Sequence, residues 1–325
     1  MNSILKKLRK NRDPAPCLFY PAAQNETIAE LLTDCEKQAR LLLRISESYP
    51  VGAVIRMTEL WCEAAAFGMQ CRLSDHDFPG LGDPVFADAE ALKGVTIPSV
   101  DNPVTKPLID AVRLAAPHMD KPLIVGVTAP YTLGSVLNGS VDFMMNCISN
   151  PDIVHGFLQQ LTSFLIEYIT AYKTAGASAV ILAEPSIAMI SPSMTGEFSN
   201  TYIKKIINRV QDETFSVIYH NCGAVNAHLD AILELDADAF HFGSEVDMDR
   251  VLRSVHDDRL VMGNIEPRLF IGDNEDAVKS NTSALWEKYA SFPNWRLSTG
   301  CDLSPNASGK SISAFFESAK GTKRN

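Results

Sequence analysis

The chain has 325 residues, of which 46% are hydrophobic, and a formal net charge of -10 at pH 7. That length and apolar content are sufficient for one large α/β domain or two smaller ones. The negative charge argues against nucleic acid and anionic membranes as partners, because both repel an acidic protein. No run of eighteen apolar residues is present, so we expect no membrane span.

The N-terminal residues 1–13 are basic, but no long apolar stretch of the kind found in secretory signals follows them. We therefore expect a solvated first helix over residues 3–10. The seven cysteines are odd in number and follow no regular spacing. They argue against a disulfide framework and favour a reducing, cytoplasmic location.

Apolar runs and helical periodicity alternate along the chain. Seven short apolar runs predict buried strands at residues 51–55, 122–127, 178–182, 215–219, 239–242, 259–263 and 295–298. Helical spacing of apolar residues is found between them at residues 152–173, 226–234 and 247–255. Continuous apolar strands that alternate with helices are typical of a parallel sheet covered by helices.

The number of these units favours a (β/α)8 TIM barrel over an open sheet. We expect a single domain over residues 1–325, with an N-terminal helical extension. No GxGxxG or GxxxxGK[ST] motif follows a strand, which weakens a nucleotide-binding alternative. Residues 75–103 are rich in proline and glycine. They are expected to form a long excursion, either a lid over the site or a structural loop.

Three residues that bind soft metals follow two of the predicted strands. His220 and Cys222 are two positions apart at the end of one strand, so both side chains point to the same face. Cys301 follows the last strand. One imidazole and two thiolates with an open fourth position are typical of a catalytic zinc site. The pattern therefore favours a zinc enzyme that acts on a thiol.

Other polar residues also follow predicted strands, as a ring of functional groups in a barrel requires. Glu59 and Glu184 either face this ring or cap helices. Tyr131 belongs to the same ring, and Asn264 either faces it or bonds the backbone of a turn. His241 lies inside an apolar strand, and we interpret it as a core residue.

Four segments resemble the uroporphyrinogen decarboxylase superfamily, and the resemblance covers most of the chain. They are residues 57–68, which end in Ala-Phe-Gly; 129–133, Ala-Pro-Tyr-Thr-Leu; 175–186, with Gly-Ala and Glu-Pro-Ser; and 261–267, with Gly-Asn-Ile-Glu-Pro. The acidic residue of the first segment is usually Asp in the family, whereas Glu59 stands here. The resemblance implies a (β/α)8 barrel, in agreement with the strand pattern.

Two further features resemble the zinc-dependent methylcobamide:coenzyme M methyltransferase branch of this superfamily. Decarboxylases carry His in a final Gly-His-Gly segment and an N-terminal Arg-Gln-Ala-Gly-Arg run. This chain has Cys301 at the first place and Phe-Tyr-Pro-Ala-Ala-Gln at residues 19–24. The branch's His-X-Cys segment and distant Cys match His220, Cys222 and Cys301, which implies that these residues bind Zn²⁺.

The same resemblance implies catalytic roles for Glu59 and Glu184 and substrate binding by Tyr131 and Asn264. The implied reaction moves a methyl group from a methylcobamide, carried by a separate corrinoid protein, to a zinc-activated thiol similar to coenzyme M. Two alternatives stay open. One is a methyltransferase that demethylates a methyl ether or methylamine onto a corrinoid protein, and the other is a decarboxylase-like or non-catalytic paralogue. The chain has no Asp-X-His-X-X-Gly cobalamin motif, so we expect no tightly bound corrinoid.

Overall fold

Seven parallel strands form one curled sheet in the computed structural model, which describes residues 6, 8, 10–23, 26–56 and 61–321. The strands are β1 (Val54–Arg56), β2 (Leu123–Thr128), β3 (Ala179–Ala183), β4 (Ser216–Asn221), β5 (Ala239–Phe242), β6 (Leu260–Ile265) and β7 (Trp295–Thr299). They lie in sequence order, and each pairs in parallel with the next. All seven predicted strands are confirmed, with boundaries that differ by at most three residues.

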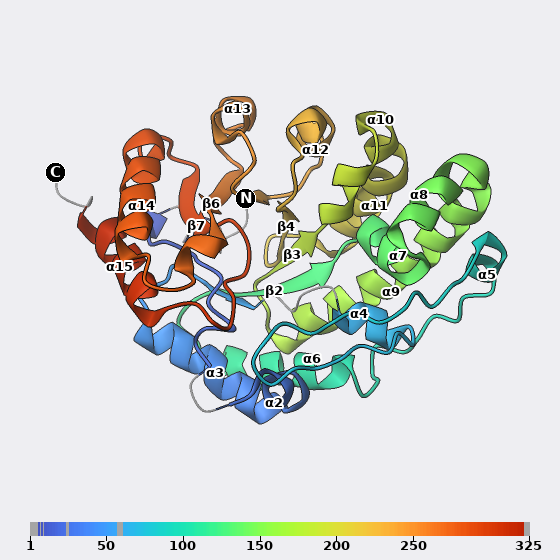
Figure 1. Ribbon diagram of the computed structural model, residues 1–325, viewed down its shortest axis with the longest axis horizontal. Helices are drawn as coiled ribbons and strands as arrows, with labels where there is room; N and C mark the ends of the chain where they lie inside the picture. Colours follow the sequence, from blue (N-terminus) through green and yellow to red (C-terminus); the bar gives the residue numbers. More distant parts are fainter. Residues whose placement is uncertain (1–5, 7, 9, 24–25, 57–60, 322–325) are drawn as a thin grey trace.

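Helices surround the strands on the outside of the sheet (Figure 1). They are α2 (Ile28–Thr33), α3 (Cys35–Ser48), α4 (Trp61–Ala66), α5 (Ala89–Lys93), α6 (Thr105–Ala115), α7 (Pro130–Asn138), α8 (Ser140–Ser149), α9 (Pro151–Ala175), α10 (Pro192–Met194), α11 (Thr201–Val210), α12 (Leu229–Leu233), α13 (Met248–Ser254), α14 (Glu275–Tyr289) and α15 (Gly309–Gly321). Short 3-10 turns are η1 (Ala116–His118), η2 (Pro185–Met189), η4 (Asn226–His228) and η5 (Pro267–Phe270), and η3 (Thr195–Asn200) is a π-helix.

The predicted helices at 152–173, 226–234 and 247–255 are confirmed as α9, as η4 with α12, and as α13. The helix predicted at residues 3–10 falls largely on residues outside the described part of the chain. Among the described residues, no helix is both long and apolar enough to cross a membrane.

Alternate residues of each strand face the inside and the outside of the curled sheet. Inside, a small apolar cluster includes Ala179, Ile181 and Ile218. Outside, Val180 and Leu182 belong to the large core that packs against the helices. This alternation follows from the two-residue period of a strand, and it decides which strand-end side chains can reach the interior.

The two edges of the sheet are joined by an irregular N-terminal segment. The Ala15 N–H donates to the Leu297 carbonyl of β7 (2.9 Å), and the Gly52 N–H donates to the Pro14 carbonyl (2.9 Å) just before β1. Pro14 and Pro16 have no N–H, so this segment cannot form a regular ladder. The expected eight-stranded barrel is therefore, among the described residues, a seven-stranded curled sheet with a proline-containing segment between its edges.

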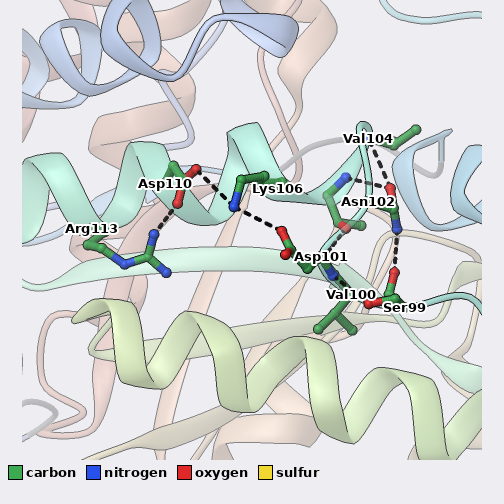
Figure 2. Close-up of polar contacts among 9 residues, drawn as sticks. Ser99, Val100, Asp101, Asn102, Val104, Lys106, Asp110 and Arg113 are labelled. Atoms are coloured by element: carbon green, nitrogen blue, oxygen red, sulfur yellow. Dashed lines mark hydrogen bonds and ion pairs between the residues drawn. The ribbon is translucent and has the colours of Figure 1, made fainter.

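The excursion over residues 75–103 packs along the outer helices. The amides of Val85 and Phe86 both donate to the Leu137 carbonyl at the end of α7, and the Phe86 ring contacts the Phe157 ring of α9. At its far end the Asn102 side chain accepts from the Val104 amide, and Figure 2 shows this turn leading into α6. These contacts favour the structural loop over the lid.

Two glycines of α9 predict opposite effects of substitution by alanine. Gly156 lies in the second turn of the helix, and apart from the local helix backbone no atom of the described residues lies within 4 Å of an added Cβ. Gly156→Ala should therefore raise the free energy of unfolding by about 0.5–1 kcal/mol. Gly176 ends the helix at φ +106°, and its added Cβ would lie 2.8 Å from the Ala116 Cβ. Gly176→Ala should lower the free energy of unfolding by about 1–2 kcal/mol. Urea denaturation of both variants measures these changes, and equal signs would contradict the α9 boundary.

Candidate metal centre

His220, Cys222 and Cys301 come together at the carboxyl-terminal edge of the curled sheet. Their ligand atoms all lie within 4.8 Å of one another. His220 is buried in β4, Cys222 directly follows β4, and Cys301 follows β7, with both cysteines half-buried. Two strands, β5 and β6, separate β4 from β7 in the sheet, so the curl is what brings these residues together.

The three side chains fit a tetrahedral zinc ion. With bonds of about 2.3 Å to sulfur and 2.0–2.1 Å to nitrogen, a tetrahedral site places sulfur and nitrogen about 3.5 Å apart. Cys301 Sγ lies 3.7 Å from His220 Nε2. Among the residues that the structure describes, one nitrogen and two sulfur donors converge and leave a fourth position open, which is the composition of a catalytic zinc site.

The His220 ring is oriented for ligation. Its Nδ1 lies 3.1 Å from the His241 backbone carbonyl. A carbonyl oxygen only accepts, so Nδ1 carries the hydrogen and Nε2 keeps the lone pair that faces Cys301. A backbone carbonyl that fixes the tautomer of a ligating histidine in this way is a common feature of metal sites.

The environment of Cys222 favours its thiolate. The hydrogen bond from the Cys301 thiol lowers the pKa of Cys222 well below its ordinary value, although burial opposes the shift. Because the thiolate is the form that binds metals, Cys222 is preorganised as a ligand.

Two glycines let the neighbouring loops approach the ligands closely. A Cβ at Gly243 would lie 2.6 Å from the Cys222 Cα. A Cβ at Gly300, next to Cys301, would lie 2.9 Å from the Ser244 amide nitrogen. Any larger residue at either position would displace a backbone that carries a candidate ligand.

A cavity of about 350 Å³ adjoins Cys222 and Cys301, which is within the size range of small-molecule sites. Its rim includes Glu245, Glu266 and Arg268. The ion pair with Arg268, together with a hydrogen bond from Ser244, lowers the pKa of Glu266 to about 2. The sequence pattern did not identify Glu266, Arg268 or the exposed Glu245 as site residues. Their positions after β5 and β6 were the available clue.

Glu184 lies one residue beyond β3 and is fully buried. Its carboxylate accepts from the amides of Tyr131 (3.0 Å) and Thr132 (2.8 Å) at the N-terminus of α7, and from Ser199 Oγ (2.8 Å). Burial raises its pKa, and these hydrogen bonds oppose the shift. Glu184 has the same strand parity as Leu182, so it points towards the helices and caps α7.

Glu59 lies outside the residues that the structure describes, so its predicted role is still a prediction. Glu63, four positions later in α4, is a buried carboxylate that the sequence analysis did not select. It accepts from the Thr128 amide (3.1 Å) and hydroxyl (2.9 Å) at the end of β2. Burial raises the pKa of Glu63. Glu63 lies on a helix, whereas the predicted site residues follow strands, so the strand pattern did not identify it.

The two predicted substrate-binding residues have structural contacts. The Tyr131 ring is buried, and its centroid lies 5.3 Å from the centroid of the Phe143 ring. The side-chain amide of Asn264 donates to the backbone carbonyls of Gly243 (2.9 Å) and Val246 (3.2 Å). Asn264 thereby holds the loop after β5, which borders the cavity, and its contact with substrate is still a prediction.

The sequence of this chain matches a known protein family. Residues 19–322 match the uroporphyrinogen decarboxylase family. A uroporphyrinogen decarboxylase of Coxiella burnetii is 23% identical over 298 residues, which span 88% of this chain and 80% of that protein. A second one, from Xanthomonas campestris, is 24% identical over 284 residues, covering 84% of this chain and 77% of that protein.

Solved structures share the fold at low sequence identity. A methyltransferase from Methanosarcina mazei superposes with a TM-score of 0.81 at 20% identity and covers 98% of both chains. A B12-independent methionine synthase from a Shewanella species, in complex with selenomethionine, superposes with a TM-score of 0.57 at 13% identity. It covers 95% of this chain and 94% of that one.

The ligand set predicts the metal content of cysteine variants. Wild-type protein should hold about one zinc per chain, since the three donors converge on one point. Cys222→Ser and Cys301→Ser should each lose most of it, because a hydroxyl is a poor zinc ligand. Cys35→Ser, at the start of α3, is the matched control and should keep the metal. Elemental analysis measures the content, and full zinc in both site variants would disprove the ligand assignment.

The lowered pKa of Cys222 predicts its reactivity in metal-free protein. An ordinary thiol, with a pKa near 8.5, is almost wholly protonated at pH 6. The hydrogen-bonded pair of Cys222 and Cys301 still holds a thiolate there, so iodoacetamide should alkylate this pair well before the other cysteines. Peptide mass spectrometry after brief labelling at pH 6 measures this preference. Unfolding in urea should abolish it, and uniform labelling of the folded protein would contradict the assignment.

Proposed function

The chain belongs to the uroporphyrinogen decarboxylase family, and we propose that it is a zinc-dependent methyltransferase. In this proposal it moves a methyl group from a methylcorrinoid, carried by a separate protein, to a small thiol. The observation that carries the proposal is the convergence of His220, Cys222 and Cys301 beside a cavity.

Porphyrinogen decarboxylation is disfavoured by the residues at two places. Cys301 occupies the position of the decarboxylase histidine, as the sequence resemblance implies. The N-terminal segment, where decarboxylases have an arginine pair, contains Phe19 and Tyr20, and both are buried with their rings 5.2 Å apart. Such a segment provides apolar packing and supplies no cation for substrate carboxylates.

Zinc bound by these three residues would lower the pKa of a coordinated substrate thiol and so favour its thiolate. The chain's own contribution is charge and geometry. The thiolates of Cys222 and Cys301 would balance the double charge of such an ion, so an added substrate thiolate would make the centre net negative and keep its sulfur electron-rich. His220, with its tautomer fixed by the His241 carbonyl, completes the set without adding charge.

In the proposed transfer, one bond forms and one bond breaks. A sulfur lone pair forms the new S–C bond to the methyl group, and the Co–C bond of the methylcorrinoid breaks. The electron pair of that bond stays on cobalt, which changes from Co(III) to Co(I). The thiol proton is released to solvent before the attack, so the products are a methyl thioether, the Co(I) corrinoid and one proton.

One fold neighbour supports methyl transfer in general, and another supports sulfur as the methyl acceptor. The Methanosarcina mazei protein is described as a methyltransferase and covers nearly the whole chain. The Shewanella protein is a methionine synthase, and methionine is itself a methyl thioether. The absence of an Asp-X-His-X-X-Gly motif here favours a methylcorrinoid brought by a partner protein.

The proposal predicts a reaction that can be followed by absorbance. With zinc-loaded protein, methylcob(III)alamin and a small thiol such as coenzyme M, cob(I)alamin should appear under anaerobic conditions. Activity should persist below the free thiol's pKa of about 8.5, since the metal-bound thiol deprotonates earlier. Cys301→Ser should abolish turnover, and Cys35→Ser should retain it.

Transfer from an O- or N-methyl compound to cob(I)alamin, without methylation of any thiol, would instead establish the substrate-side reaction. Failure in both directions, with cognate corrinoid protein supplied, would refute methyl transfer.

A further inference from the structure

His241 is a fully buried histidine inside the sheet, directly beside the candidate metal centre. It lies on β5, in register with His220 of β4, and its ring centroid is 4.7 Å from the His220 ring. The sequence alone favoured a core role for it. Apart from His220, its neighbours on the same inner face include the apolar residues Ile218 and Met262, among which an imidazole is unusual.

Its hydrogen bonds connect the two strands that carry the candidate ligands. His241 Nε2 lies 2.8 Å from the Thr299 carbonyl and 3.0 Å from Ser298 Oγ. The Thr299 carbonyl only accepts, so Nε2 carries the hydrogen. The backbone carbonyl of His241 accepts from His220 Nδ1 at 3.1 Å.

The bond from His241 to Thr299 connects two strands, β5 and β7, that are not paired through backbone hydrogen bonds. β5 pairs with β4 and β6, whereas Thr299 ends β7, so the imidazole reaches across β6 through the sheet interior. Thr299 stands two residues before Cys301. One residue therefore contacts the imidazole ligand through its carbonyl and holds the strand end that leads to the distant thiolate.

The environment of the other ring nitrogen indicates that His241 does more than fill space in the core. Within the described part of the chain, the buried His241 Nδ1 has no hydrogen-bond partner. A buried polar atom without a partner costs about 1–3 kcal/mol, and an apolar side chain of similar size would avoid that cost. The bond made by Nε2 is what distinguishes histidine from phenylalanine or leucine at this position.

We propose that His241 is a positioning residue of the metal centre, whose Nε2–H bond to the Thr299 carbonyl fixes Cys301 relative to His220. The inference rests on the metal centre of the proposed function and adds to it a residue that touches neither metal nor substrate. Partners that orient ligands in this indirect way change metal affinity by about 10- to 100-fold when removed.

Three variants test the role. His241→Phe keeps the ring volume and removes the donor, so zinc affinity should fall by about 10- to 100-fold. His241→Gln places an amide N–H near the position of Nε2 and should retain most of the affinity. Met262→Leu, in register with His241 on β6 and also buried, is the packing control and should bind as wild type does.

Zinc affinity is measured by competition with a chromophoric chelator. The visible spectrum of the Co²⁺-substituted protein reports the ligand geometry. A changed spectrum in His241→Phe and a near-normal one in His241→Gln would support positioning. If His241→Phe does not fold, His241→Asn replaces it, because its shorter amide cannot reach Thr299, and the same loss of affinity is expected.

The outcomes separate this inference from the proposed function. Wild-type affinity and spectrum in His241→Phe, or in His241→Asn where that variant replaces it, would overturn the positioning role and leave the metal centre intact. An equal loss in His241→Gln would also overturn it, since the donor would then be irrelevant. Absence of zinc binding by the wild-type protein would overturn the metal centre and the inference together.

Discussion

The curl of the parallel sheet is the constraint on which the site depends. His220 and Cys222 stand at the end of β4, and Cys301 follows β7, with two strands between them. In a flat sheet those ends would lie about 14 Å apart, three strand spacings of about 4.8 Å. Curling brings the three ligand atoms within 4.8 Å of one another. The irregular segment that joins β7 to the start of β1 helps to hold the curl.

Buried polar groups hold the carboxyl ends of the strands to their surroundings. Glu184 joins the end of β3 to the N-terminus of α7, and Glu63 joins α4 to the end of β2. Inside the sheet, His241 joins β5 to the end of β7. Each of these groups is desolvated, so each is tolerated only because it is hydrogen-bonded. Together they fix the carboxyl ends of β2, β3 and β7 relative to α4, α7 and β5.

Much of this arrangement could be predicted from the sequence, because apolar runs and the two-residue strand period are local properties. They located all seven strands and placed His220 and Cys222 on one face. The same period, applied to Glu184, would have turned it towards α7. Contacts that depend on the tertiary fold were less accessible. Glu63 lies on a helix, and the role of His241 depends on a hydrogen bond to a distant strand. Pro14 and Pro16, which have no N–H, were not recognised as residues that prevent a regular ladder between β7 and β1.

The central claim is that one imidazole and two thiolates of this chain bind zinc and leave a position for a substrate thiol. Zinc K-edge X-ray absorption of the wild-type protein tests it directly. We expect two sulfur scatterers at about 2.3 Å with nitrogen or oxygen at about 2.0–2.1 Å, and three sulfurs after a thiol is added. A first shell of nitrogen and oxygen alone, unchanged by the thiol, would contradict it.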